Sequence, residues 1–277
     1  MAKGIGLIGN FKGKVGNMVG YKLSDSNTGN SQGIRVYQPI VRNPKTSAQA
    51  EQRAKLAPIN ATYRALKMVI DRGNEGLPYG NKSRLAWLKQ AFKAEHMPWF
   101  VKGAQISDPV VCQLTKGSLV GVNYSIVSST ITVQATGLTD STDITTIGKL
   151  STALLGAIPS LRAGDQITFV ALQPVNGQLS ANVFSFVLNT EDSKAQSQIE
   201  VQNDAVYMDA FEGVGFGAVI VSREGANGEH LRSTTTLLAT EGATADAPYD
   251  ADSKAAAIES YQNAAGANAD WAEESIQ

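Results

Sequence analysis

Short runs of β-branched and aromatic residues, separated by turn-forming residues, fill the sequence between residues 98 and 240. The candidate strands are 110–114, 119–124, 131–136, 166–173, 181–188, 196–202, 217–223 and 230–238. Asn176-Gly177 lies between two of these runs and is typical of a two-residue hairpin turn. About eight short strands with regular turns favour an antiparallel sandwich or barrel over a parallel α/β sheet. Residues 146–155 are expected to form either a helix or an insertion.

Helical spacing dominates the preceding segment, residues 46–97. Thr46 and Gln49 form a capping box, in which each side chain satisfies a free backbone N–H group at the start of a helix. We expect this helix to reach Ala57, because Pro58 removes a backbone donor and breaks or kinks a helix interior.

Two further helices are expected in the same segment, each with one apolar face. The first covers residues 59–70, and the second runs from Asn81 or Ser83 to about Glu95. The expected apolar faces are Ile59, Tyr63, Leu66 and Ile70 on the first helix and Leu85, Leu88 and Phe92, with Trp87 adjacent, on the second. Because short helices are marginal in isolation, we expect these helices to be packed against other elements.

Residues 1–45 are basic and rich in glycine. Residues 33–39 alternate as a short edge strand does, and Pro39 ends the pattern. A segment of this composition can hardly bury enough apolar surface to fold alone. The sequence therefore predicts an arm that becomes ordered against a partner.

Charge is segregated along the chain, although the net charge is only −1. Residues 1–110 contain 17 Lys or Arg and 6 Asp or Glu, a net charge of +11, whereas residues 111–277 contain 7 and 19, a net charge of −12. Scattered charge would bear only on solubility, but segregated charge indicates electrostatic complementarity with a partner.

Basic side chains near the N-terminus are the chemical signal that points most directly to a partner. The candidate binding residues are Lys12, Lys14, Lys22, Arg35, Arg42, Lys45, Arg53 and Lys55. They would neutralise nucleic-acid phosphates, with Tyr21 and Tyr37 available for stacking. Alternatively, they are the solvated faces of short helices, or they meet the acidic body or tail of a neighbouring copy. The opposite charge on the same chain favours the protein partner.

The C-terminal segment, residues 241–277, is acidic, with 8 Asp or Glu and Lys254 as its one basic residue. A helix is possible at 253–264, where Ala257, Ile258 and Tyr261 share one side. The segment is either a disordered tail or a docking peptide in which Trp271 anchors a neighbouring subunit.

Motifs that would indicate enzymatic chemistry lack the sequence context that this chemistry requires. Residues 4–9 match the letters G-x-G-x-x-G, but only three residues precede Gly4, whereas a dinucleotide fold needs a strand there. His96 and His230 are the only histidines and lie in different segments, which argues against a structural zinc site. Cys112 is the only cysteine and lies in an apolar run, so we expect a small buried hydrophobic residue. We expect no catalytic residues, no cofactor and no metal.

No stretch approaches the roughly 18 uninterrupted apolar residues that a membrane helix needs. The N-terminus carries lysines but has no compact apolar region, so it does not match a secretory signal. These features predict a chain that works in the cytoplasm where it is made, or in a particle assembled there, and they argue against a cell-surface adhesin.

Several segments together resemble a known family. They are Gly13-Lys14-Val15-Gly16-Asn17-Met18-Val19-Gly20-Tyr21, Arg42-Asn43-Pro44-Lys45-Thr46 followed by Gln49, Gln52 and Arg53, then Lys116-Gly117-Ser118-Leu119, Ala218-Val219-Ile220-Val221-Ser222-Arg223 and Arg232-Ser233-Thr234. The chain resembles, over residues 5–240, a family of uncharacterised proteins common in Bacteroidota and their phages. The resemblance implies a helical N-terminal module and an immunoglobulin-like β-sandwich. The family has no established activity, so no functional residue carries over, and the acidic segment after residue 240 departs from its pattern.

The sequence predicts an α+β chain in four parts: a basic glycine-rich arm (1–45), a helical module (46–97), an antiparallel immunoglobulin-like β-sandwich (98–240) and an acidic tail (241–277). The functional hypothesis is a non-enzymatic structural protein of a phage virion, such as an auxiliary capsid, connector or cargo protein. Its oppositely charged ends favour head-to-tail contacts with copies of itself or with other virion proteins. The alternative is a nucleic-acid-binding protein without sequence preference.

Overall fold

The computed structural model describes residues 13–22, 32–37, 46–127, 130–135, 144–202, 204–209, 215–226, 228–245 and 248–263. The chain divides into two compact units, residues 1–45 (unit 1) and residues 46–277 (unit 2). Helices and antiparallel sheets both contribute, so the predicted α+β class is confirmed.

Unit 1 contains a three-stranded antiparallel sheet. Its strands follow each other in chain order: β1 (Gly13–Val15), β2 (Met18–Lys22) and β3 (Gln32–Val36). The turn between β1 and β2 has two residues, and Gly16 adopts a φ of +56° there, a conformation that glycine reaches at little cost. The strand predicted at residues 33–39 is found as β3, at the edge of the sheet.

Unit 2 is built from three sheets and five helices among its described residues. The five-stranded sheet contains β12 (His230–Arg232), β11 (Phe216–Glu224), β7 (Gln166–Val175) and β8 (Gln178–Val187) in that order, with β14 (Leu238–Ala239) also paired to β11. The four-stranded sheet has the order β5 (Tyr124–Val127), β6 (Thr130–Gln134), β10 (Ala205–Asp209) and β9 (Ile199–Gln202). A short pair joins β13 (Thr235–Thr236) to β4 (Gln113–Thr115). The helices are α1 (Ser47–Ala65), α2 (Lys67–Ile70), α3 (Asn81–Ala91), α4 (Ile147–Ala157) and α5 (Ala251–Asn263).

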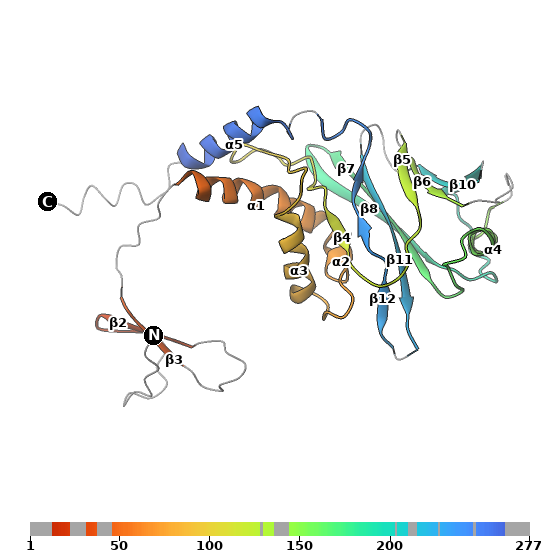
Figure 1. Cartoon of the computed structure of the whole chain (residues 1–277), viewed down its shortest axis with the longest axis horizontal. Helices are drawn as coiled ribbons and strands as arrows, with labels where there is room; N and C mark the ends of the chain where they lie inside the picture. Colours follow the sequence, from red (N-terminus) through yellow and green to blue (C-terminus); the bar gives the residue numbers. More distant parts are fainter. Residues whose placement is uncertain are drawn as a thin grey trace. The chain divides into compact units, whose positions relative to one another are not determined.

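The five-stranded sheet is the middle of three layers (Figure 1). Successive side chains of a strand point to opposite faces. On β7, Phe169 therefore packs in one hydrophobic cluster, with the four-stranded sheet and α4, and Val170 packs in the other, with α1, α2, α3 and α5. Burial on both faces explains the continuous apolar sequence of β7 and β11. The helices of residues 46–97 and the strands of residues 98–240 thus share one core, and no boundary between compact units falls at residue 97.

Helix α1 continues through Pro58, so the break predicted there is wrong. Pro58 is buried, and its carbonyl accepts a hydrogen bond from the Thr62 hydroxyl at 2.9 Å. The same Thr62 oxygen accepts a hydrogen bond from the Val110 N–H, also at 2.9 Å. These contacts, together with the burial of Ile59, outweigh the roughly 3 kcal/mol that a proline costs inside a helix. The N-cap half of the predicted capping box is confirmed, because the Thr46 side chain accepts from the Gln49 N–H. The reciprocal half is wrong, because the Gln49 side-chain oxygen is buried without a hydrogen-bond partner among the described residues.

The predicted apolar face of helix α3 is confirmed in part, because Leu88 and Phe92 pack against the core. Ser83, Trp87 and Ala91 are buried, whereas Leu85 is half-exposed. Ser83 can occupy a core position because its hydroxyl donates to the Ile70 carbonyl at 2.7 Å. The predicted stripe is therefore wrong at Leu85, since a satisfied serine replaces an apolar residue in the contact. The face predicted for residues 59–70 is confirmed: Ile59, Leu66 and Ile70 are buried and Tyr63 is partly buried.

Two further local predictions have clear outcomes. The hairpin between β7 and β8 has the predicted turn, in which Asn176 and Gly177 both adopt a positive φ. Residues 146–155 form a helix, α4, with the Thr146 hydroxyl accepting from the Lys149 N–H. Strand β10 was not among the predicted strands.

The helix considered possible at residues 253–264 is found as α5, which packs against α1 with Ala257 buried. Just before α5, the Tyr249 hydroxyl donates to the Pro109 carbonyl at 2.9 Å, and the Trp99 N–H donates to the Pro248 carbonyl at 3.0 Å. The described part of the acidic segment thus belongs to unit 2, because its apolar side chains pack against the helical layer. Residues 264–277, with the predicted anchor Trp271, lie outside the described residues.

Candidate functional site

One face of the unit 1 sheet is cationic and aromatic. Directly paired residues of antiparallel strands project to the same face. Lys14 is paired with Val19, and Val19 is paired with Arg35, so both cations lie on one face. The Lys14 ammonium lies over the Tyr37 ring, 3.6 Å from its centre, which is close enough for a cation–π contact.

The opposite face of the same sheet is apolar and exposed. Met18 is paired with Val36, and Ile34 is paired with Gly20. Met18, Ile34 and Val36 are 43%, 52% and 76% exposed, respectively. We call these three side chains the apolar face of unit 1. The exposure of adjacent apolar side chains makes this face a candidate interaction site.

The predicted basic residues do not all gather in one place. Lys14 and Arg35 share the cationic face, and Lys22 ends β2, opposite Gln32. Lys12, Arg42 and Lys45 lie outside the described residues, and nothing is described of the Lys22 side chain. Arg53 and Lys55 lie on α1, in unit 2.

Lys55 takes part in an intramolecular contact. Its ammonium lies 3.0 Å from the Glu51 carboxylate, and Lys254 of α5 lies 3.5 Å from the same carboxylate oxygen. Both lysines also lie over the Trp99 ring, 5.8 and 5.2 Å from its centre. The hydrogen bond from Lys55 lowers the pKa of Glu51 below its ordinary value. This cluster joins α1, α5 and Trp99, and Glu51 partly balances the charge of Lys55 within unit 2.

A second candidate surface is the free edge of β8. Within the described residues this strand pairs only with β7, although it is 10 residues long. Its sequence, Gln178–Val187, contains no charged residue and no proline. Val183 and Val187 are 44% and 49% exposed. Unpaired backbone groups on such an edge are a template for another strand.

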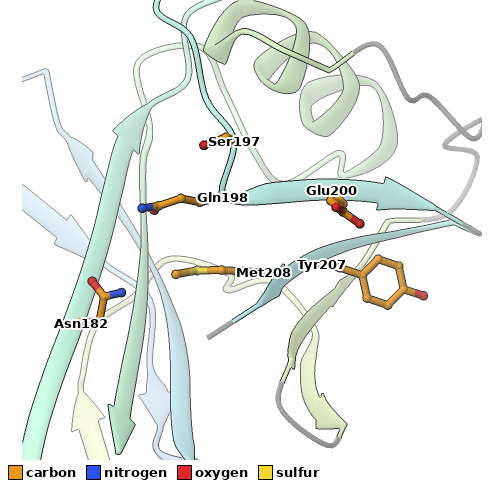
Figure 2. Close-up of a pocket in the computed structure, with 6 residues that line it drawn as sticks. All are labelled: Asn182, Ser197, Gln198, Glu200, Tyr207 and Met208. Atoms are coloured by element: carbon orange, nitrogen blue, oxygen red, sulfur yellow. The ribbon is translucent and has the colours of Figure 1, made fainter. Parts of the chain in front are cut away.

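A small hollow lies beside this edge, between the two sheets (Figure 2). Its volume is about 240 Å³, and it is lined by Asn182, Ser197, Gln198, Glu200, Tyr207 and Met208. Asn182 comes from β8, whereas the other five residues come from β9, β10 and the segment before β9. Among the described residues that line it, the hollow has one carboxylate, Glu200, and no histidine or cysteine.

The buried ion pair of unit 2 has a structural role. Asp165 accepts hydrogen bonds from Arg223 Nε at 2.6 Å and Nη2 at 2.7 Å, and from the Arg162 N–H at 2.8 Å. Hydrogen bonding to Asp165 raises the pKa of Arg223. Both carboxylate oxygens are therefore engaged inside the protein. Among the described residues, no group of three or more His, Cys, Asp and Glu side chains is placed to hold a metal ion.

Cys112 is buried, as predicted. Burial raises the pKa of its thiol from 9.0 to about 12, although the nearby Trp87 indole acts in the opposite direction. A thiol of this kind is a poor nucleophile, because the thiolate is the reactive form.

We compared the chain with protein-family models, curated proteins and solved structures. No family model matches the chain, and neither the curated proteins nor the solved structures provide a match. Within the described residues, no helix has the length and apolar character needed to span a membrane.

Sequence reasoning missed the apolar face of unit 1 and the free edge of β8. The apolar face of unit 1 has a weak signal, because Ile34 and Val36 alternate with Gly33 and Arg35. The free edge of β8 has no signal in the sequence, because the sequence of a strand does not indicate which other strands will pair with it.

Proposed function

We propose that this chain is a non-enzymatic structural protein that assembles into a larger particle through the sheet of unit 1. The observation that carries the proposal is the exposure of apolar side chains on one face of that sheet and of cations on the other. Small sheets are stable in water only when an apolar face is buried, and Met18, Ile34 and Val36 on the apolar face of this sheet are exposed. A partner that covers the apolar face would stabilise the sheet by about 1.5–3 kcal/mol for each large side chain that becomes fully buried.

Charge supports a second copy of the chain as this partner. Residues 1–45 contain seven Lys or Arg and one Asp, a net charge of +6, and residues 46–277 contain 17 and 24, a net charge of −7. Unit 1 of one copy is thus electrostatically complementary to unit 2 of the next. Such head-to-tail contacts close into rings or continue as filaments.

In this proposal the two facing sheets of unit 2 form an immunoglobulin-like body, and the protein is a phage virion component, such as an auxiliary capsid, connector or cargo protein. The resemblance to a phage-associated family supports the setting, and the single carboxylate among the described residues that line the hollow supports a non-enzymatic role.

Substitution of the apolar face tests the proposal. The variant Met18→Ser/Ile34→Thr/Val36→Thr should lose its oligomers in sedimentation velocity at physiological salt, because the partner no longer gains apolar contacts. The matched control Lys14→Gln/Arg35→Gln changes the opposite face and should weaken assembly mainly at low salt. A parent chain that stays monomeric at every concentration would contradict the proposal, and so would undiminished oligomers in the triple variant.

The cationic face favours a second candidate function, binding of nucleic acid without sequence preference. Lys14, Arg35 and Tyr37 combine positive charge with a ring, as single-strand-binding surfaces do. This function predicts an affinity that falls with salt, with a log–log slope of about 0.7 to 0.9 for each phosphate neutralised. The Lys14→Gln/Arg35→Gln variant should then reduce the slope, while the apolar-face variant leaves it unchanged. Absence of binding to single- and double-stranded nucleic acid at low salt would exclude this function.

A further inference from the structure

The edge of β8 differs from the other sheet edges among the described strands of unit 2. Strands β5 and β9 have 4 residues each, and β12 has 3. Two of these edges also carry charge, at Glu200 on β9 and Arg232 on β12. Short length and charge are the devices by which proteins prevent edge-to-edge pairing. With 10 residues and no charge, β8 has neither protection.

The backbone groups that β8 turns outward follow from the hairpin. In a two-residue hairpin the residues that flank the turn form a hydrogen-bonded pair, and hydrogen-bonded and non-bonded pairs then alternate. Val175 and Gln178 flank this turn, so the even-numbered residues of β8 bond to β7. The outward N–H and C=O groups belong to Leu179, Ala181, Val183, Ser185 and Val187.

The described residues around this edge leave it open to a strand. Leu179 and Ala181 pack partly against the helical layer, whereas Val183, Ser185 and Val187 are exposed. On the other face of the strand, Asn182 borders the hollow toward β9 and β10 (Figure 2). Space therefore separates β8 from the edge of the four-stranded sheet.

The sequence of the edge is self-complementary. The outward residues are distributed symmetrically about Val183, so antiparallel pairing of two β8 strands centred there leaves none of them without a partner. Leu179 then faces Val187, Ala181 faces Ser185, and Val183 faces its own copy. No like charges meet across the pair, because the strand has none. A second copy matches β8 in length and in its lack of charge, and closed two-fold dimers are the commonest oligomers of soluble proteins. These features favour a second copy over an unrelated strand.

We propose that β8 is the pairing edge of a symmetric dimer, in which β8 of a second copy lies antiparallel to it with Val183 on the two-fold axis. The two five-stranded sheets would become one continuous sheet. The contact is isologous and closes as a dimer, so it differs from the head-to-tail contact proposed for unit 1. A particle built with both contacts would assemble from dimers.

Cysteine cross-linking in the full chain tests the pairing and its register. In a hydrogen-bonded antiparallel pair the facing Cα atoms lie about 5.5 Å apart, within disulfide range. Val183→Cys should therefore give a disulfide-linked dimer under mild oxidation. Val187→Cys is the matched control, because in this register the two copies of residue 187 lie about 26 Å apart along the strand. The native Cys112 does not compete, since it is buried.

Each outcome decides the proposal. Cross-linking at position 183 but not at 187 supports it, whereas cross-linking at 187, or at neither position, overturns the symmetric register. Val183→Lys should abolish the dimer at concentrations where the parent forms it, because two ammonium groups would meet at the axis. Val127→Lys places the same charge on an exposed valine of β5 and should leave the dimer intact. Cross-linking of Val183→Cys must also persist when Met18, Ile34 and Val36 are replaced, which separates this contact from that of unit 1.

Discussion

The sheet of unit 1 and the five-stranded sheet of unit 2 are opposite cases of antiparallel pairing. The central strands of the five-stranded sheet are buried on both faces, by helices on one and by a second sheet on the other. The unit 1 sheet exposes apolar side chains on one face and cations on the other. The comparison teaches that the central strands of unit 2 are covered within the unit itself, whereas both faces of the unit 1 sheet carry exposed side chains. Four predictions test this contrast.

Thiol reactivity should show the largest difference between the units. Burial raises the pKa of Cys112 from 9.0 to about 12, which leaves about a thousandfold less thiolate at a given pH near neutrality. A cysteine introduced as Val36→Cys would be exposed in dilute, monomeric protein and should react rapidly there with a thiol reagent at pH 8. In that variant two kinetic phases are expected, and the slow one should disappear in denaturant. Rapid reaction of Cys112 in the native parent chain would contradict the burial described for it.

Truncation of a side chain should reduce the free energy of unfolding much more in the five-stranded sheet of unit 2 than in the sheet of unit 1. Phe169 is buried between the two sheets of unit 2 and stacks near Phe186, with ring centres 6.5 Å apart. Phe169→Ala should lower the free energy of unfolding by about 3–5 kcal/mol in urea titration. Val36→Ala, at an exposed position of unit 1, should change it by less than about 0.5 kcal/mol. Equal effects would remove the energetic difference between the sheets.

The buried ion pair provides a similar test within unit 2. Arg223→Ala leaves the Asp165 carboxylate buried without its partner, which should cost about 3–5 kcal/mol. The control is Lys194→Ala, because Lys194 is exposed and lies 3.9 Å from Asp192. Loss of an exposed pair should cost less than about 1 kcal/mol. A small effect of Arg223→Ala would show that the pair does not stabilise the five-stranded sheet.

The smallest expected effect is a dependence of stability on pH at Glu75. Burial alone would raise the pKa of this carboxylate, but hydrogen bonds from the Ser118 and Arg232 N–H groups and the Ser118 hydroxyl outweigh it and lower the pKa below 4.5. A group with a lowered folded-state pKa contributes stability above its unfolded pKa and loses it as the pH falls. The parent should therefore lose part of its stability between pH 4.5 and the lower folded pKa, and Glu75→Gln should lose less over that interval. Parallel stability curves for the two proteins would contradict this role.

Local interactions made part of the fold predictable. The cap at Thr46, the turn at Asn176-Gly177 and the buried side chains Leu66 and Ile70 were all anticipated, because each depends on residues only a few positions apart. The class, α+β, follows from the same patterns. Pro58 and Leu85 were misjudged, because tertiary contacts decide whether a proline is tolerated and which side of a helix is buried.

The candidate surfaces were less predictable for the same reason. The basic character of Lys14 and Arg35 is visible in the sequence, but their common face depends on the strand register. The contact of Lys55 with Glu51 spans one helical turn, so the sequence could have predicted it. The position of Lys55 near Trp99 and Lys254 depends on tertiary packing, which the sequence pattern does not show. The free edge of β8 emerges only once the order of all the strands is known.

Hydrogen exchange at the amides of β2 tests the central claim most directly, namely that the unit 1 sheet is stabilised by a partner. Amides of β11 serve as the internal reference, because that strand is central in unit 2 and should be protected at every concentration. We predict that β2 exchanges rapidly in dilute, monomeric protein and becomes protected when the chain associates. Strong protection of β2 in the dilute monomer, unchanged on association, would contradict the account.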